Sequence, residues 1–106
     1  MNLRQNKVKD LLKGLAAQFL QSESNYTSLI TVTSADVSTD FKRATIFVTI
    51  FPEESEEDAM NFLKRKRKGF KEFVMAKAKL RRIPFFDFEI DRGEKNRQLI
   101  DSLVLD

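Results

Sequence analysis

Hydrophobic residues near the start of the chain recur at the spacing of a helix. Val8, Leu11, Leu12, Leu15 and Phe19 stand at positions i, i+3, i+4, i+7 and i+11. This spacing places their side chains on one face of a helix of about five turns. The pattern therefore predicts an amphipathic N-terminal helix whose apolar face packs against a core.

Two predicted strands follow this helix. Residues 22–28 are mostly polar and predict an exit loop, and residues 29–37 are rich in Thr, Val and Ile and predict a strand. Residues 40–43 predict a turn, after which residues 44–50 alternate in the pattern of a second strand that returns antiparallel to the first. Pro52 ends this strand because proline has no backbone N–H to donate.

The next segment predicts two helices separated by a break. Ser55 is a candidate N-cap, and the carboxylates at 56–58 suit the positive end of a helix dipole. A continuous helix would carry Lys66 into the middle of its apolar face, where an unpaired ammonium group is costly. Gly69 lies just beyond and has a low helix propensity. We therefore predict a break near Gly69 and a second helix that ends before Pro84.

A third strand is predicted where apolar and acidic residues alternate: Phe86, Phe88 and Ile90 against Asp87, Glu89 and Asp91. A short closing helix is predicted from Leu99, Ile100, Leu103 and Val104. The predicted order is α-β-β-α-α-β with a terminal helix, in a single domain of residues 1–106. The fold class is α+β, with helices packed on one face of a three-stranded sheet.

Composition excludes several kinds of chemistry. The chain has no Cys and no His, which removes thiolate nucleophiles, Cys/His zinc sites and Ser-His-Asp triads. The acidic residues at 53–58 lack the glycine spacing of a calcium loop, and Gly14, Gly69 and Gly93 are too far apart for a phosphate loop. The acidic side of the third strand is interpreted as the solvated face of an antiparallel strand. We expect no catalytic residue, no metal and no cofactor.

The apolar stretches are short. Met1–Lys13 mixes polar and apolar residues, unlike a signal peptide, and no apolar run approaches the length of a membrane span. The absence of Cys fits a reducing compartment. We expect a soluble, cytoplasmic monomer.

The charge is strongly segregated along the chain. Residues 64–82 hold ten basic side chains and one acidic one, for a local charge of +9, whereas the remainder carries −6. A charge run alone often marks only a solvated face, but this segregation and the position at a helix break favour polyanion binding. The candidate RNA-binding residues are Lys64, Arg65, Arg67, Lys68, Gly69, Lys71, Lys77, Lys79, Arg81 and Arg82.

Two motifs resemble those of the ribosome-binding factor A family. Residues 37–49 read Val-Ser-Thr-Asp-Phe-Lys-Arg-Ala-Thr-Ile-Phe-Val-Thr, close to the family's Val-Ser-x-Asp-Leu-x-x-Ala-x-Val-Tyr-Val-Ser. Residues 80–84 read Leu-Arg-Arg-Ile-Pro, similar to the family's Leu-Arg-x-x-Pro, and Phe88-x-x-Asp91 follows. The resemblance implies a type II KH-like domain without the Gly-x-x-Gly loop. It also implies a helix–kink–helix with Ala-x-Gly at the bend, where Gly69 fills the glycine and Arg67 replaces the alanine.

The resemblance further implies a function. It points to a non-catalytic assembly factor that binds the 30S ribosomal subunit and its 16S rRNA during late maturation, including maturation of the 5′ end. A second hypothesis is that the chain is a protein-interaction adaptor whose basic helix pair docks an acidic partner. A third is a small nuclease or phosphoryl-transfer enzyme that uses only carboxylates and lysines.

Overall fold

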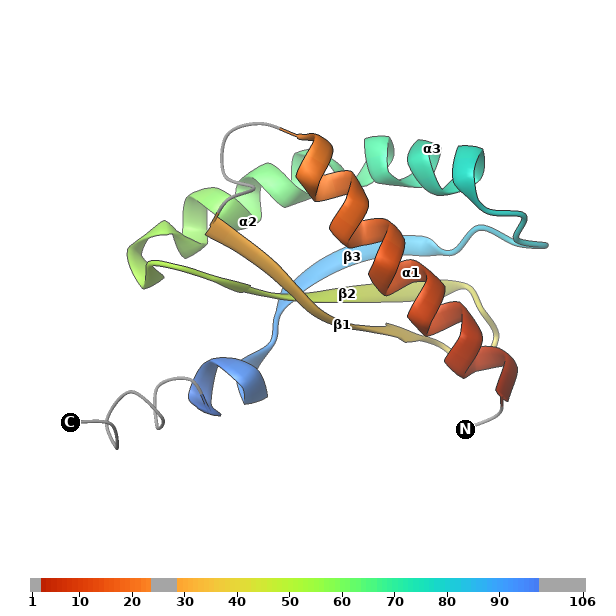
Figure 1. The fold of residues 1–106 in the computed structure, drawn as a ribbon, viewed down its shortest axis with the longest axis horizontal. Helices are drawn as coiled ribbons and strands as arrows, with labels where there is room; N and C mark the ends of the chain where they lie inside the picture. The colour runs from red at the N-terminus through yellow and green to blue at the C-terminus, as the bar shows by residue number, and fades with distance from the viewer. Residues whose placement is uncertain (1–2, 24–28, 98–106) are drawn as a thin grey trace.

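The chain forms a three-stranded sheet with helices packed on one of its faces (Figure 1). The computed structural model describes residues 3–23 and 29–97. The elements are α1 (Leu3–Ser22), β1 (Ile30–Val37), β2 (Arg43–Ile50), the 3-10 turn η2 (Glu53–Ser55), α2 (Glu56–Arg65), α3 (Arg67–Lys77) and β3 (Phe85–Ile90). Residues 92–97 are also helical. The predicted order α-β-β-α-α-β is confirmed, whereas Leu99, Ile100, Leu103 and Val104 of the predicted closing helix lie outside the described residues.

The sheet is mixed, and β2 is its central strand. Ala44 of β2 pairs with Val37 of antiparallel β1 on one side and with Phe86 of parallel β3 on the other. The interpretation of the third strand as antiparallel is therefore wrong. Because α2 and α3 together carry the chain back along the sheet, β3 starts at the same end as β2.

A cluster of phenylalanine rings joins the helices to the sheet. Phe70 of α3 is fully buried, and its ring centroid lies 4.8 Å from that of Phe86 and 5.8 Å from that of Phe88. Phe19 of α1 contacts the same ring at 5.4 Å. The apolar side chains of the central strand complete this core beneath the helices: Ala44, Ile46, Val48 and Ile50. The prediction that the helices share one face of the sheet is confirmed.

The buried face of α1 is turned from the predicted one by part of a turn. Leu12, Leu15 and Phe19 are buried as predicted, but Leu11 is 40% exposed. The face that packs on the sheet instead includes Ala16, whose small side chain lets the helix approach closely.

The predicted pair of separate helices is confirmed, but the break lies at Lys66 and not at Gly69. Lys66 has φ −94° and ψ 0°, so it ends α2 and precedes α3. Its ammonium Nζ lies 3.2 Å from Oε2 of Glu23 and 5.5 Å from the centroid of the Phe62 ring. Gly69 lies inside α3 without a positive φ. The break therefore occurs at the residue whose charge could not be buried, because this allows the ammonium group to reach a carboxylate.

Ser55 occupies the predicted N-cap position of α2, but its side chain makes no capping hydrogen bond. Ser55 itself has helical dihedral angles because η2 runs directly into α2. A residue with that backbone does not aim its hydroxyl at the amides of the next turn. The carboxylates of Glu56, Glu57 and Asp58 fill the first turn as predicted.

Asp91 caps the helical residues 92–97 and is not simply part of a solvated acidic face. Its Oδ1 accepts a hydrogen bond from the Glu94 amide at 3.0 Å, and its Oδ2 accepts one from the Thr33 hydroxyl at 2.6 Å. Thr33 lies at an irregularity in the pairing of β1 with β2. These bonds, the Thr33 hydroxyl foremost, lower the pKa of Asp91 below its usual value.

We expect Gly69→Ala to stabilise the protein. The glycine is helical, and an added Cβ would lie 3.5 Å from Cζ of Phe19, which is an ordinary van der Waals contact. Alanine has the higher helix propensity, so the free energy of unfolding should rise by up to about 1 kcal/mol. Urea unfolding of both proteins measures the change. A loss of stability would mean that the Phe19 ring cannot accommodate the methyl group.

We expect Asp91→Asn to reduce the acid sensitivity of the fold. Because the pKa of Asp91 is lowered in the folded state, its ionised form stabilises the protein above the usual value of 3.8. That contribution is lost as pH falls through the folded-state pKa. Thermal melts at pH values from above 3.8 down through the folded-state pKa of Asp91 should show a smaller loss of Tm in Asp91→Asn than in the parent protein. Asp10→Asn, which changes an exposed carboxylate on α1, is the control.

Candidate nucleic-acid interface

Two grooves lie side by side on the surface and share Arg82 and Pro84. The basic groove has a volume of about 730 Å³ and is lined by Lys42, Lys64, Arg65, Arg67, Lys68, Lys71, Arg82, Ile83, Pro84, Phe85 and Phe86. The N-terminal groove, of about 720 Å³, is lined by Arg4, Val8, Asp40, Phe41, Lys79, Leu80, Arg81, Arg82 and Pro84.

The basic groove brings cations from four parts of the chain onto one surface. Lys64 and Arg65 end α2, and three further cations belong to α3: Arg67, Lys68 and Lys71. Lys42 comes from the turn before β2 and Arg82 from the loop before β3. The described residues that line it include seven cations and no carboxylate. Such a surface attracts anions because the lining itself contains no carboxylate, although Asp87 contacts Arg67 from outside it.

Arg67 occupies the wall of the basic groove next to an exposed ring. Its guanidinium carbon lies 5.5 Å from the ring centroid of Phe85, which is 57% exposed. Its Nη1 lies 3.6 Å from Oδ1 of Asp87, and its Nε donates a hydrogen bond to the carbonyl oxygen of Lys64 at 3.3 Å. The groove therefore combines exposed lysines with an arginine that has two polar contacts and with one aromatic surface.

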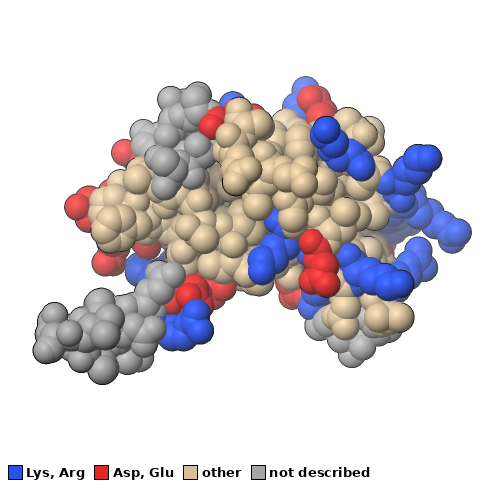
Figure 2. Space-filling view, in the orientation of Figure 1, with Lys and Arg blue, Asp and Glu red and all other residues tan. Residues whose placement is uncertain are grey.

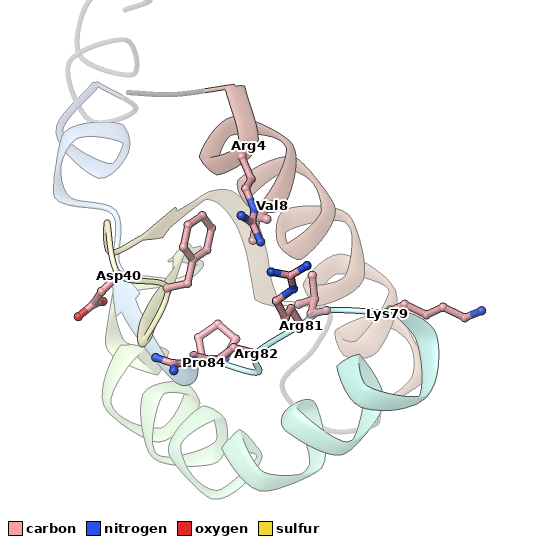
Figure 3. Close-up of a pocket in the computed structure, with 9 residues that line it drawn as sticks. Arg4, Val8, Asp40, Lys79, Arg81, Arg82 and Pro84 are labelled. Atoms are coloured by element: carbon pink, nitrogen blue, oxygen red, sulfur yellow. The ribbon is translucent and has the colours of Figure 1, made fainter.

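The N-terminal groove is less uniformly positive. Figure 3 shows Arg4 and Arg81 directed into the groove, whereas Lys79 and Asp40 point away from it. The guanidinium carbon of Arg4 lies 5.4 Å from the ring centroid of Phe41. The Ser38 hydroxyl, followed by the Lys42 amide, lowers the pKa of Asp40. This groove therefore keeps one negative charge at its edge.

Most of the predicted site residues meet in these grooves. Lys64, Arg65, Arg67, Lys68, Lys71 and Arg82 line the basic groove, and Lys79, Arg81 and Arg82 line the N-terminal groove. Lys77 lines neither, and its Nζ lies 5.8 Å from the centroid of the Phe73 ring. Gly69 also lines neither, because it faces Phe19 in the interior.

Two cations and an exposed ring also line the grooves and were not predicted as site residues from the sequence: Arg4, Lys42 and Phe85. Arg4 and Lys42 are distant from the basic run in sequence, and only the tertiary structure brings them beside it. The outward orientation of Phe85 could have been predicted from the sequence. It precedes Phe86 in a strand, so if Phe86 faces the core then Phe85 must face outward.

Basic and acidic side chains gather at opposite ends of the molecule. Figure 2 shows most of the visible Lys and Arg at the end where α3 runs into the loop before β3, and acidic side chains at the end where α2 begins. The segregation inferred from the sequence therefore persists in the folded molecule.

None of the helices within residues 3–23 and 29–97 is long and apolar enough to cross a membrane. No group of three or more carboxylates in these ranges is placed to hold a metal ion.

Comparison with known proteins identifies the family. The model of the family described as ribosome-binding factor A matches residues 4–104. The chain belongs to the ribosome-binding factor A family. It is 33% identical to ribosome-binding factor A of Prochlorococcus marinus (strain NATL1A), over 94% of this chain and 86% of that protein.

Solved structures agree with this assignment. The crystal structure of ribosome-binding factor A from Thermus thermophilus is similar, with a TM-score of 0.76 and 26% identity over 83% of this chain and 97% of that one. A homology model of the Thermus thermophilus factor, fitted into a cryo-EM map of its complex with the 30S subunit, is similar in fold, with a TM-score of 0.67 and 24% identity. It covers 79% of this chain and 91% of that one. The predicted KH-like architecture of the family is confirmed.

Proposed function

We propose that this chain is a non-catalytic assembly factor that binds the 30S subunit by contacting 16S rRNA through the basic groove. The observation that carries the proposal is the gathering of seven cations without a lining carboxylate. Phosphate neutralisation by Lys and Arg supplies most of the affinity of such surfaces for nucleic acid. The chain would act as one KH-like domain, residues 1–106, and as a monomer in the cytoplasm.

Family membership supports the choice of ligand. The name of the family refers to ribosome binding, and a similar protein of Thermus thermophilus has been fitted into a map of its 30S complex. The N-terminal groove would extend the RNA path past Arg82 toward Arg81 and Arg4. Gly69 and Lys77 lie outside both grooves, so we propose no RNA contact for them.

We expect charge reversal in the basic groove to weaken RNA binding without unfolding the protein. In the double variant Lys64→Glu/Lys71→Glu both changes are at exposed positions, so Tm should change little. If each lysine contacts one phosphate, the slope of log affinity against log salt should become less negative by about 1.4 on single-stranded RNA. Filter binding across a salt series, and co-sedimentation with 30S particles, measure the two effects.

The matched control reverses two exposed lysines of α1 that line neither groove, in Lys7→Glu/Lys13→Glu. It changes net charge equally and should keep the parent slope. Equal losses in both double variants would show a nonspecific charge effect and would contradict the groove as the site. Binding to 30S particles that survives nuclease digestion of the RNA would favour an acidic protein partner instead.

We also propose that binding assists late maturation of the subunit, including processing of the 16S rRNA 5′ end, as the family resemblance implies. In cells depleted of their own factor, expression of this chain should lower the fraction of 16S rRNA with an unprocessed 5′ end. Primer extension measures that fraction. The Lys64→Glu/Lys71→Glu variant should leave it high, and the Lys7→Glu/Lys13→Glu variant should restore it. Equal restoration by both variants would separate processing from the basic groove.

A further inference from the structure

An exposed aromatic ring lies on the wall of the basic groove. Phe85 begins β3, is 57% exposed, and faces the side of the sheet away from the core because its neighbour Phe86 is buried. Its amide donates a hydrogen bond to the carbonyl oxygen of Lys42, just before the central strand, at 2.8 Å, and Phe85 pairs with Arg43 of that strand, so its backbone is held in the sheet. A ring on a fixed backbone loses little freedom when it binds a ligand.

The surroundings of this ring differ from those of an ordinary exposed apolar side chain. Single exposed hydrophobic residues are common and need no function. Phe51, for example, is 80% exposed and lines neither groove. Phe85 instead shares its groove with seven cations, and the guanidinium group of one of them, Arg67, lies over its ring.

Arg67 is held in place by groups on two different elements. Asp87 lies two residues along β3 on the same side as Phe85, and its carboxylate is 3.6 Å from the guanidinium Nη1. The carbonyl oxygen at the end of α2 accepts a second interaction from Nε. These two contacts hold the planar guanidinium over the ring.

We propose that Phe85 is a stacking platform for one unpaired RNA base, with the Arg67 guanidinium over one face of the ring and the base on the other, and with Lys64, Lys68 and Lys71 binding the flanking phosphates. This inference rests on the proposed function and names the form of RNA that the groove takes. Bases within a duplex are already stacked on each other, so they cannot lie on the ring without unpairing. The site therefore selects single-stranded or bulged RNA over a helix.

The test compares three variants on two RNA probes. One probe is a single-stranded oligouridylate of about 10 nucleotides with a fluorescent purine analogue at its centre, and the other is a duplex of equal length. Phe85→Leu keeps an apolar side chain but removes the ring, Phe85→Tyr keeps a ring, and Phe51→Leu removes an exposed ring elsewhere. Affinity is measured across a salt series, together with the change in fluorescence that stacking causes.

We expect Phe85→Leu to lower affinity for the single strand by about 10-fold at every salt concentration. The salt slope should not change because no phosphate contact is lost. Quenching of the purine analogue should disappear in this variant and persist in Phe85→Tyr. Phe51→Leu, and every variant on the duplex, should stay within about 2-fold of the parent protein, a margin well below the loss of one stacked base.

The outcomes separate the stacking platform from the proposed function. Suppose that Phe85→Leu keeps the affinity and the fluorescence quenching of the parent protein while Lys64→Glu/Lys71→Glu binds RNA weakly. The groove then binds RNA, but the proposal that Phe85 stacks a base is wrong. If neither variant weakens RNA binding, both the proposed RNA contact of the basic groove and the proposed stacking on Phe85 are contradicted. A Phe85→Leu variant that loses affinity equally for duplex and single strand would also overturn the selection of unpaired RNA.

Discussion

The fully buried ring of Phe70 fixes where α3 lies on the sheet. It contacts Phe19 of α1 and the inward rings of Phe86 and Phe88 of β3, so three elements meet on one side chain. Burial of such a ring contributes about 1.5–3 kcal/mol, and each favourable ring pair adds about 0.5–1.5 kcal/mol. Because Phe86 must face this cluster, strand alternation turns Phe85 to the opposite side, where it lines the basic groove.

The break at Lys66 distributes a run of cations that no single helix face could carry comfortably. Like charges one turn apart repel each other, and a buried ammonium would need a partner. The break directs Lys66 back toward Glu23, whereas its basic neighbours on both sides line the groove. Their side chains are mostly exposed, so solvent screens the remaining repulsion. A polyanion in the groove would remove that repulsion, which favours binding.

The acidic end of the molecule is organised differently from the basic end. There, Lys95 lies 2.9 Å from a carboxylate oxygen of Glu56 and 3.2 Å from one of Glu53, and these two carboxylates raise its pKa. Many of the carboxylates also lie at the start of α2, where the helix dipole stabilises them. Glu53 and Glu56 are thus paired with a lysine, whereas the lining of the basic groove contains no carboxylate. Because basic and acidic side chains gather at opposite ends, the molecule has a dipolar field that can orient an approaching RNA.

The sequence alone determined the element order, the inward alternation of Phe86 and Phe88, the existence of a helix break and most cations of the interface. These follow from periodicity and local charge, which depend on residues close together in the chain. Only the tertiary structure decided that β3 is parallel to β2, that the break lies at Lys66, and that Arg4 and Lys42 lie beside the basic run. It also decided that Gly69 faces Phe19 in the interior. The physical reason is that strand direction, ion-pair partners and groove walls depend on contacts between residues far apart in sequence, about which local patterns carry no information.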